Sequence, residues 1–578
     1  MVGTWKLGER KVRPGTYFRT EAVGVVTEGA INGIAAMLIS SNWGALNKIV
    51  DVDQTMLNNL SEWFGEGNGV EAIKEALLGG ATTVKVIRVG GSKDAVAPKC
   101  TLYLPNVSKN VSCWFKQNGT DTINIYHKNY RKVIKNSDCA TGGKLAWKVK
   151  FANKWLTPTT DYTITVTPDA DNKYYSAMTL KLTAAGMAKV QAAGTNWTFG
   201  VYKSYTLKAE KAATVYGRFV GSREFTCAVK TDLLSGFRQF LVYDGDILFD
   251  SVRFEPGGDE VAKLVEALAT NRNFKAVAAG SGVLADVTGR AITGGVNPKI
   301  NVAAYSAGTD VLERSYWNTV MADKDSAAIK NLLSEFVKMS YETGRLGIAV
   351  IAGKSSEGWD EDTVSSVARI NYCNALNDWR IVYIPTGWID INGVKFEGWR
   401  AAARIGGMIA AVETNASLTH IVIQNALELI EPKTHGEITQ AEQKGCFMFS
   451  LNDDDQIWID NAITTFTTLD NEHDQGWEKV RRTKCRFELM TRVNRTCEKL
   501  VGRLNNDENG RATIITAMNS IINEMIGEGK LFSGSYAHED PRYTPEGDRA
   551  WFVLDIDDID SMEKLYLTYR FSYGRRLA

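Results

Sequence analysis

The sequence predicts an α/β multidomain protein with a central doubly wound α/β domain, inserted β-rich domains, and an α+β C-terminal domain with terminal strand arms. Three observations predict this class. Continuous apolar runs alternate with helical patterns in residues 25–94 and again in 256–439, residues 95–255 consist almost entirely of short strand-like runs, and two amphipathic helices dominate 440–578. A chain of 578 residues is also too long for one hydrophobic core.

The first part of the chain predicts an arm followed by the beginning of the α/β core. Residues 1–24 are polar, and Pro14 and Gly15 interrupt any helix, so we expect a connector arm there. Residues 34–40 form an apolar run that is typical of a strand buried on both faces. The next expected elements are two helices and one strand, over residues 57–64, 70–78 and 82–89.

Residues 95–255 are rich in Thr, Val, Tyr and Trp in short runs, which Asn, Asp, Gly and Lys separate. This pattern predicts strands and turns, with one helix at 184–194. We therefore expect one or two inserted β-rich domains, because the entropy of loop closure grows slowly with the length of an insertion.

The α/β pattern returns at Glu260, and we assign residues 256–439 to the main α/β domain. Three apolar runs there, at 346–353, 379–385 and 420–425, alternate with helical segments. Buried strands that alternate with helices predict a parallel, doubly wound sheet.

The last part, residues 440–578, ends in an alternating segment. A hairpin turn is expected at 452–455, followed by helices around 477–504 and 514–525. In the final run, five apolar side chains share one face of the predicted strand: Leu565, Leu567, Tyr569, Phe571 and Tyr573. An unpaired terminal strand is a liability in a monomer, so we expect it to add to the sheet of a neighbouring molecule.

Charge and hydropathy exclude several function classes. Lys plus Arg equal Asp plus Glu at 67 each, so nothing predicts nucleic acid or an anionic membrane as a partner. A neutral chain is also poorly protected from self-association. We expect no secretory signal and no membrane insertion, because the first residues lack an apolar region and no run reaches about 18 apolar residues.

The eight cysteines show no CxxC spacing, so we expect reduced core thiols in a chain folded in a cytoplasm, with no metal site. They are Cys100, Cys113, Cys139, Cys227, Cys373, Cys446, Cys485 and Cys497.

The catalytic and ligand-binding motifs considered fail on spacing or context. Gly353-Lys354-Ser355 follows a strand as in a phosphate-binding loop, but position 348, where that loop needs glycine, is Ile348. The glycines in 65–69 follow a helix, as in an ordinary turn. His420 and His435 lack the spacing of a triad, and the Asp residues in 453–455 and 555–560 resemble turns more than metal loops. We expect no catalytic residue and no cofactor, and an α/β enzyme with β-rich accessory domains is the alternative.

Basic side chains dominate the first C-terminal helix. The pattern fits either a solvated helix face or a basic stripe that docks on an acidic partner. The residues are Lys479, Arg481, Arg482, Lys484, Arg486, Arg492, Arg495 and Lys499, against Glu478, Glu488 and Glu498.

Five segments, in order, resemble motifs of the contractile phage tail sheath family. They are Arg13-Pro14-Gly15-Thr16-Tyr17; Ile292-Thr293-Gly294-Gly295; Arg404-Ile405-Gly406-Gly407-Met408-Ile409-Ala410 with Asn415-Ala416-Ser417-Leu418-Thr419; Ile463-Thr464-Thr465-Phe466-Thr467-Thr468-Leu469; and Val501-Gly502-Arg503 with 505–511. Thr464 and Val296 depart from the family pattern, and residues 95–205 match none of it.

This resemblance implies a structural, non-enzymatic subunit. It would form stacked hexameric rings around an inner tail tube protein, with baseplate and tail terminator proteins at the ends, in a virion tail or phage-tail-like particle assembled in the host cytoplasm. A sheath-like component that forms one ring only is another reading. The resemblance further implies a subtilisin-like topology without protease activity, an outer β insertion and a tube-facing C-terminal domain.

The mechanism expected from these residues is strand exchange between neighbouring copies. Residues 10–26 and 563–574 would be the connectors, completing sheets that include 447–451, 456–460 and 463–469. The connector residues expected are Tyr17, Phe18, Val23, Val25, Leu565, Leu567, Tyr569, Phe571 and Tyr573; the tube-contact candidates are Lys479, Arg481, Arg482, Lys484 and Arg486.

Overall fold

The structure is a computed structural model, and the chain divides into two compact units. One unit is Met1–Gly91 with Lys299–Ala578, and the other is Ser92–Pro298. The residues described are 2–4, 16–18, 32–91, 93–117, 120–125, 148–168, 175–192, 197–206, 209–355, 365–469 and 473–571.

A six-stranded sheet forms the centre of the first unit, in the order β22-β21-β20-β3-β5-β4. Neighbouring strands are parallel except β4, which runs antiparallel to β5. The order reverses between β3 and β20, which confirms the predicted doubly wound, mostly parallel sheet. The strands are β3 (Ile34–Ile39), β4 (Ile49–Asp53), β5 (Thr83–Arg88), β20 (Thr319–Ala322), β21 (Ile348–Ala352) and β22 (Ile381–Ile384).

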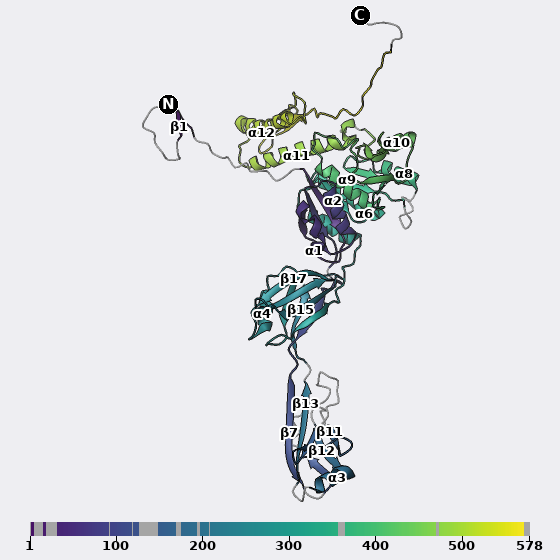
Figure 1. The fold of residues 1–578 in the computed structure, drawn as a ribbon. Coiled ribbons are helices and arrows are strands. Elements are labelled where there is room, and N and C mark those ends of the chain that lie inside the picture. Colours follow the sequence, from purple (N-terminus) through teal and green to yellow (C-terminus); the bar gives the residue numbers. More distant parts are fainter. Residues whose placement is uncertain are drawn as a thin grey trace. The chain divides into compact units, whose positions relative to one another are not determined.

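Helices cover both faces of this sheet (Figure 1). Met37 and Ile39 join the core beneath α2 and α9, whereas Ala36 and Leu38 join the opposite core beneath α5, α6 and α8. Successive strand residues point to opposite faces, so the continuous apolar run of β3 is explained by burial on both sides. The helices are α2 (Asn68–Leu78), α5 (Val302–Leu312), α6 (Ala327–Glu342), α8 (Ser366–Leu376) and α9 (Trp399–Ala411).

Helices α2 and α9 contact each other through glycines. A Cβ atom on Gly407 would overlap the carbonyl oxygen of Ala76, and one on Gly79 would overlap the carbonyl oxygen of Arg404. The two backbones therefore lie closer than any larger residue at these positions would allow.

Smaller elements complete this region. They are a 3₁₀ turn (Gln54–Asn59), α1 (Leu60–Phe64), a three-stranded sheet of β23 (Trp388–Asp390), β24 (Lys395–Phe396) and β25 (Ala426–Leu429), and α10 (His435–Glu442). The strand predicted at 420–425 is wrong in position. His420 and Asn425 have φ values of 63° and 64°, which interrupt an extended backbone at both ends of the run.

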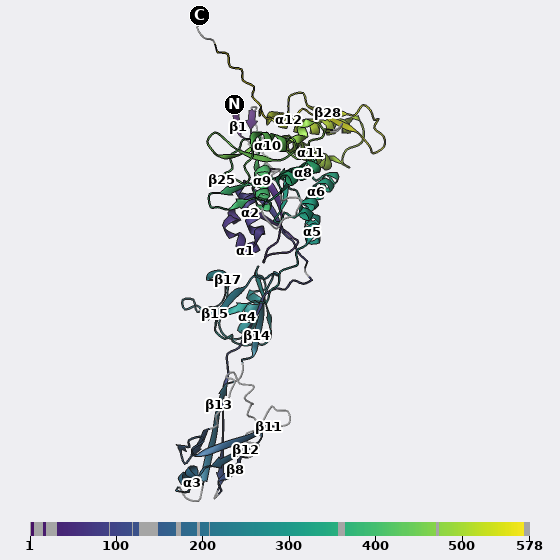
Figure 2. The ribbon, with the colours of Figure 1, turned by 90° about the vertical axis from the view of Figure 1, so that its right-hand side faces the viewer.

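The C-terminal part contains the predicted hairpin and two long helices. β26 (Met448–Leu451) pairs antiparallel with β27 (Ile457–Asn461), which confirms the turn at 452–455. Helices α11 (Val480–Leu500) and α12 (Glu508–Gly527) pack together over a core that includes Leu489, Met518 and Ile522 (Figure 2). A short antiparallel pair, β28 (Tyr536–Glu539) and β29 (Phe552–Asp555), lies beside α12.

The second unit contains a first β-lobe made of two sheets, β18-β14-β6 and β17-β16-β15-β19. The predicted boundary at residue 255 is wrong, because β18 pairs with β14, β19 pairs with β15, and α4 packs on β17 and β18. Residues 256–298 therefore belong to this unit and not to the main α/β domain. The elements are β6 (Lys99–Tyr103), β14 (Lys211–Gly217), β15 (Phe225–Thr231), β16 (Arg238–Asp244), β17 (Ile247–Phe254), α4 (Glu260–Ala267), β18 (Phe274–Ala278) and β19 (Val287–Ile292).

A second β-lobe in this unit has the sheets β10-β9-β13-β7 and β11-β12-β8, and its core includes Val149, Leu180 and Phe199. The predicted helix in this stretch forms as α3. The elements are β7 (Ser108–Gln117), β8 (Thr122–Ile125), β9 (Lys148–Phe151), β10 (Lys154–Trp155), β11 (Tyr162–Pro168), β12 (Tyr175–Leu182), α3 (Ala184–Gln191) and β13 (Trp197–Thr206).

Candidate assembly interface

The C-terminal segment, residues 561–571, presents large apolar side chains to solvent. Leu565, Leu567, Tyr569 and Phe571 are 68%, 70%, 73% and 93% exposed. Contiguous exposed apolar side chains are typical of an interaction site. The predicted strand does not form within the described part of the chain, because no ladder is made by these residues and a strand needs a backbone partner. Tyr573 lies outside the described residues.

Ion pairs bind the root of this segment to the folded body. The ammonium group of Lys479 lies 2.8 Å from Asp560 Oδ2 and 2.8 Å from Glu563 Oε2. The other oxygen of Glu563 accepts hydrogen bonds from Ser417 Oγ, at 2.8 Å, and Thr419 Oγ1, at 3.2 Å. The chain is therefore held as far as Glu563, immediately before the exposed apolar residues.

Asp558 makes a second anchor a few residues earlier. Arg482 donates to its two oxygens at 2.7 and 2.8 Å, and Arg486 donates at 3.0 Å. Burial alone would raise the pKa of Asp558, but hydrogen bonds from the two guanidinium groups lower it below its ordinary value. Arg486 also pairs with Asp474 at 2.7 Å.

These contacts correct the expectation of an exposed basic stripe. Arg481 and Lys484 are each only 5% exposed. Arg481 donates to the carbonyl oxygen of Ile559, and Lys484 donates to carbonyl oxygens at the end of α9, those of Ile409 and Val412. Lys479, Arg482 and Arg486 bind acidic residues of the same chain. Lys479, Arg481, Arg482 and Arg486 thus anchor the C-terminal segment of their own chain, Lys484 caps α9, and a tube contact stays a prediction.

The anchor's acidic members were missed by sequence reasoning, which interpreted the Asp residues of 555–560 as a turn. The sequence feature that could have revealed them is a pair of oppositely charged clusters, one on the first C-terminal helix and one just before the final apolar run. Residues about 80 positions apart in sequence carry no spacing rule that would pair them, so only the fold reveals the partnership.

The β26–β27 hairpin offers one open edge. On the far side of β27, His420 N donates to Ile459 O at 2.7 Å and Ile423 N donates to Ile457 O at 2.9 Å, so that edge is occupied. On the far side of β26, Phe447 N donates to Tyr383 O at 3.0 Å. Beyond this bond, β26 has no second strand partner among the described residues.

The stretch 463–469, expected to be a strand of the same sheet, is irregular. Ile463 makes a single bridge with Lys479, Thr464 Oγ1 donates to Trp477 O at 2.9 Å, and Thr465 N donates to Ile381 O at 2.9 Å. These threonines connect loops instead of continuing a ladder, so the expectation of a strand here is wrong.

The N-terminal arm contains a short parallel pair. β1 (Val2–Thr4) pairs with β2 (Thr16–Phe18), which includes the predicted connector residues Tyr17 and Phe18. Val23 and Val25 lie outside the described residues. The connector role of this arm stays a prediction.

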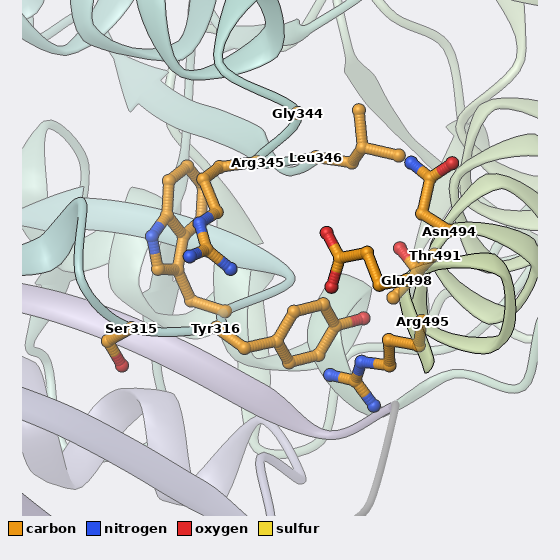
Figure 3. A pocket seen from close by; sticks show the side chains of 10 residues that line it. Ser315, Tyr316, Gly344, Arg345, Leu346, Thr491, Asn494, Arg495 and Glu498 are labelled. Carbon is orange, nitrogen blue, oxygen red and sulfur yellow. The ribbon is translucent and has the colours of Figure 1, made fainter. Parts of the chain in front are cut away.

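A cleft lies where α11 faces two loops of the α/β domain (Figure 3). Tyr316, Arg495 and Glu498 point toward one another in it, and the Arg495 guanidinium carbon lies 4.6 Å from the centre of the Tyr316 ring. Burial raises the pKa of Tyr316 above its ordinary value. Arg495, which was expected in the basic stripe, thus makes a cation–π contact with this aromatic ring.

The motifs that sequence reasoning set aside have structural roles here. Ser355, in the loop after β21, donates from its amide and hydroxyl to Glu397 Oε2 at 2.9 and 2.7 Å. The donors of this loop thus bind a carboxylate of the same chain. The His420 ring stacks on Trp458 with centroids 3.9 Å apart. His435 begins α10, directly after the capping residue Thr434.

Within the described ranges, no cluster of three or more His, Cys, Asp or Glu has an arrangement that could hold a metal ion. Among these same residues, no helix combines the length and the apolar character needed to cross a membrane.

Comparison with known proteins finds a family resemblance in the central part of the chain. Residues 298–465 match the family model described as the phage tail sheath protein central domain. The chain is 20% identical over 300 residues to the uncharacterized protein YqbK of Bacillus subtilis (strain 168), an alignment that covers 50% of this chain and 59% of that relative.

Two solved structures share the fold. The sheath tail protein of Desulfitobacterium hafniense is 13% identical, with a TM-score of 0.56 over 94% of this chain and 100% of that chain. The sheath tail protein of Listeria innocua is also 13% identical, with a TM-score of 0.56 over 92% and 96%. These two likenesses show the fold, and the family resemblance drawn from the sequence motifs is supported by the family model over residues 298–465.

Proposed function

We propose, from the premise that residues 298–465 of this chain are a phage tail sheath central domain, that the protein is a structural subunit of a contractile tail sheath. Copies polymerise as stacked hexameric rings around an inner tube, and contraction drives the tube through a target cell envelope. The proposal includes the family's subtilisin-like topology for the main α/β domain and excludes catalysis as the working principle.

The observation that carries the proposal is the C-terminal segment. An ion pair with Lys479 holds this segment at Glu563. Beyond Glu563, the segment exposes apolar side chains at alternate positions: Leu565, Leu567, Tyr569 and Phe571. Such a segment gains a ladder of backbone hydrogen bonds and buries one apolar face when it adds to a foreign sheet edge. Burial of each large apolar side chain contributes roughly 1.5–3 kcal/mol before the ordering of the segment is subtracted.

The receiving edge is the far side of β26 in a neighbouring copy. Donor and acceptor are different surfaces of the same chain, so the contact is heterologous and repeats into rings and an open helical lattice. The N-terminal arm, residues 10–26, is the second connector. The proposed partners beyond neighbouring copies are the tube, baseplate and terminator proteins of a virion tail or phage-tail-like particle.

Contraction requires no nucleotide in this mechanism. The strand ladder keeps neighbouring subunits linked while their bodies rotate as rigid units, and the extended lattice is a kinetically trapped state. The contracted lattice buries more surface per subunit, and many subunits add their gains along one sheath.

The test is a comparison of polymerisation by negative-stain microscopy. The full chain should form striated tubes at high concentration, whereas deletion of residues 564–578 should give a folded, soluble protein without tubes. Compact particles from the full chain would favour the enzyme reading, and single rings would favour a baseplate or collar component.

A matched pair of substitutions tests the register of the connector. Leu567→Asp places a charge on the apolar face and should abolish tubes, while Thr568→Asp places the same charge on the opposite face and should leave them. Equal effects from both variants, or tubes from the deletion, would reject the connector assignment.

A further inference from the structure

Two buried cysteines face each other across the two sheets of the first β-lobe. Cys100 lies on β6, an edge strand of one sheet, and Cys227 lies on β15 in the interior of the other. Their Sγ atoms are 3.8 Å apart, and the residues are 6% and 0% exposed. Both are free thiols.

We propose that Cys100 and Cys227 are a redox-active dithiol that closes to an inter-sheet disulfide when a small peroxide reaches it. The inference concerns the second unit alone and does not depend on the proposed sheath function.

Cys100 is the cysteine equipped to react first. Hydrogen bonding with Cys227 lowers the pKa of the Cys100 thiol, burial opposes this, and the positive charge of Arg290 lowers it further. Arg290 stands opposite Cys227 in the β15–β19 ladder. The hydrogen bond to Cys100 and burial raise the pKa of Cys227 against a smaller opposing effect of Arg290, so Cys227 keeps its proton and acts as the resolving thiol.

A cleft lies further along the strand that carries Cys100. Leu102, Tyr103, Asp286 and Arg290 line a cleft along β6 and β19. The guanidinium carbon of Arg290 lies 4.7 Å from the centre of the Tyr103 ring at this cleft. Cys100 stands two residues before the cleft-lining Leu102 and is 6% exposed, whereas Cys227 is fully buried, so we expect a molecule as small as hydrogen peroxide to reach Cys100 first.

The chemistry balances with one peroxide. The Cys100 thiolate attacks one peroxide oxygen, the O–O bond breaks, and the sulfur is oxidised to sulfenic acid while hydroxide leaves. The Cys227 sulfur then attacks the Cys100 sulfur, the S–OH bond breaks, and the proton of Cys227 leaves with the hydroxide as water. Two thiols and one peroxide give one disulfide and two waters.

The geometry permits closure with a small movement. A disulfide needs its sulfurs about 2.05 Å apart, so these must approach by about 1.8 Å. Backbone hydrogen bonds also tie β6 to Thr293 at Lys99 and to Ala285 at Tyr103, so we expect rotation of the two cysteine side chains to supply most of that approach. The bond would join strands on either side of the insertion that holds the second β-lobe, and it would lock the two sheets of the first lobe together.

The experiment treats the purified, reduced full chain with graded hydrogen peroxide, blocks remaining thiols, and analyses tryptic peptides without reduction. The expected product joins the peptides 100–109 and 224–230, with the loss of two hydrogens. The buried pair Cys373 and Cys446 in the other unit is the internal control, because its thiols lie in a closed apolar core.

Variants separate the two roles. Cys227→Ser should leave Cys100 as a sulfenic acid that a dimedone probe traps, while Cys100→Ser should leave Cys227 unmodified. Arg290→Gln should slow alkylation of Cys100 several-fold and move its pH profile upward. Oxidation at Cys373 and Cys446 before the 100–227 pair, or Cys100 trapped as sulfenic acid in the unmodified chain without cross-linking, would overturn the proposal.

Discussion

The ammonium group of Lys479 lies 2.8 Å from Glu563 Oε2, and this ion pair ties the C-terminal segment to the folded body. Lys479 is also 2.8 Å from Asp560, so one side chain fixes two points of the same segment. The exposed apolar residues that follow therefore begin directly after a position that the folded body holds in place.

Replacing Lys479 should free the root of the segment with little change in global stability. In Lys479→Met we expect hydrogen exchange of amides 561–571 and trypsin cleavage after Lys564 to accelerate about fivefold. Partly exposed ion pairs contribute only about 0–1 kcal/mol to unfolding, so the thermal midpoint should move by little. Lys338→Met breaks an exposed pair on α6 and should change neither rate. Equal cleavage rates in Lys479→Met and the unmodified chain would contradict the anchor.

Lys484, in contrast to Lys479, should contribute strongly to the free energy of unfolding. Its ammonium group donates to Ile409 O and Val412 O at the end of α9, and a Met there would leave these buried carbonyls without donors. We expect Lys484→Met to reduce the free energy of unfolding by about 2–4 kcal/mol, because buried polar groups lose their partners. Urea unfolding followed by circular dichroism measures this. Lys444→Met, which removes an exposed hydrogen bond to Asn371, is the control and should stay within about 0.5 kcal/mol.

Gly407 should tolerate no side chain. Gly407→Ala forces α9 away from Ala76 on α2, and we expect a loss of about 1–3 kcal/mol, as in overpacked cores. Gly436→Ala makes the same chemical change in α10, where a Cβ atom meets nothing within 4 Å, and should be neutral or stabilising. Urea midpoints of the two variants test the contrast, and similar values for both would refute the close contact of α2 and α9.

Glu442 should give the protein a distinct pH dependence. Burial, together with Asp460, raises the pKa of Glu442 to about 8. The folded state therefore holds its proton between about pH 4.5 and 8 while the unfolded state has lost it, so this contribution to stability is full below that window and falls as pH rises through it. Glu442→Gln cannot ionise, and its stability relative to the unmodified chain should increase from pH 5 to pH 8.5.

The control for this pH dependence is Gln440→Asn at an exposed position of α10, where neither side chain ionises. Its difference from the unmodified chain should stay constant over the same pH range. A difference between Glu442→Gln and the unmodified chain that did not vary with pH would contradict the raised pKa.

Periodicity in the sequence predicted the buried strands because burial on both faces leaves a direct trace. The runs that became β3, β21 and β22 are continuous apolar segments, and the hairpin between β26 and β27 has an explicit turn signal. The boundary at residue 255 failed for a different reason. The amphipathic pattern of a helix such as α4 predicts that one face packs on a sheet, but it does not predict which sheet.

Charge patterns were the least informative part of the sequence. Arg482 and Asp558 are 76 residues apart, and each looks solvent-facing in its own segment. The irregular path of 463–469 was equally hidden, because a run of threonines suits a strand but also suits side-chain bonds to loops, as Thr464 makes.

The ionic root and the apolar continuation of the C-terminal segment respond oppositely to the solvent. Added salt screens the contacts of Lys479, Arg482 and Arg486 with their carboxylates, and kosmotropic salts strengthen the association of Leu567 and Phe571 with an apolar surface. At high sulfate concentration the orientation of the segment should therefore become less defined while its apolar residues bind an apolar surface more strongly. For the proposed assembly, this would separate the regularity of the tubes from the amount of tube formed in one salt titration.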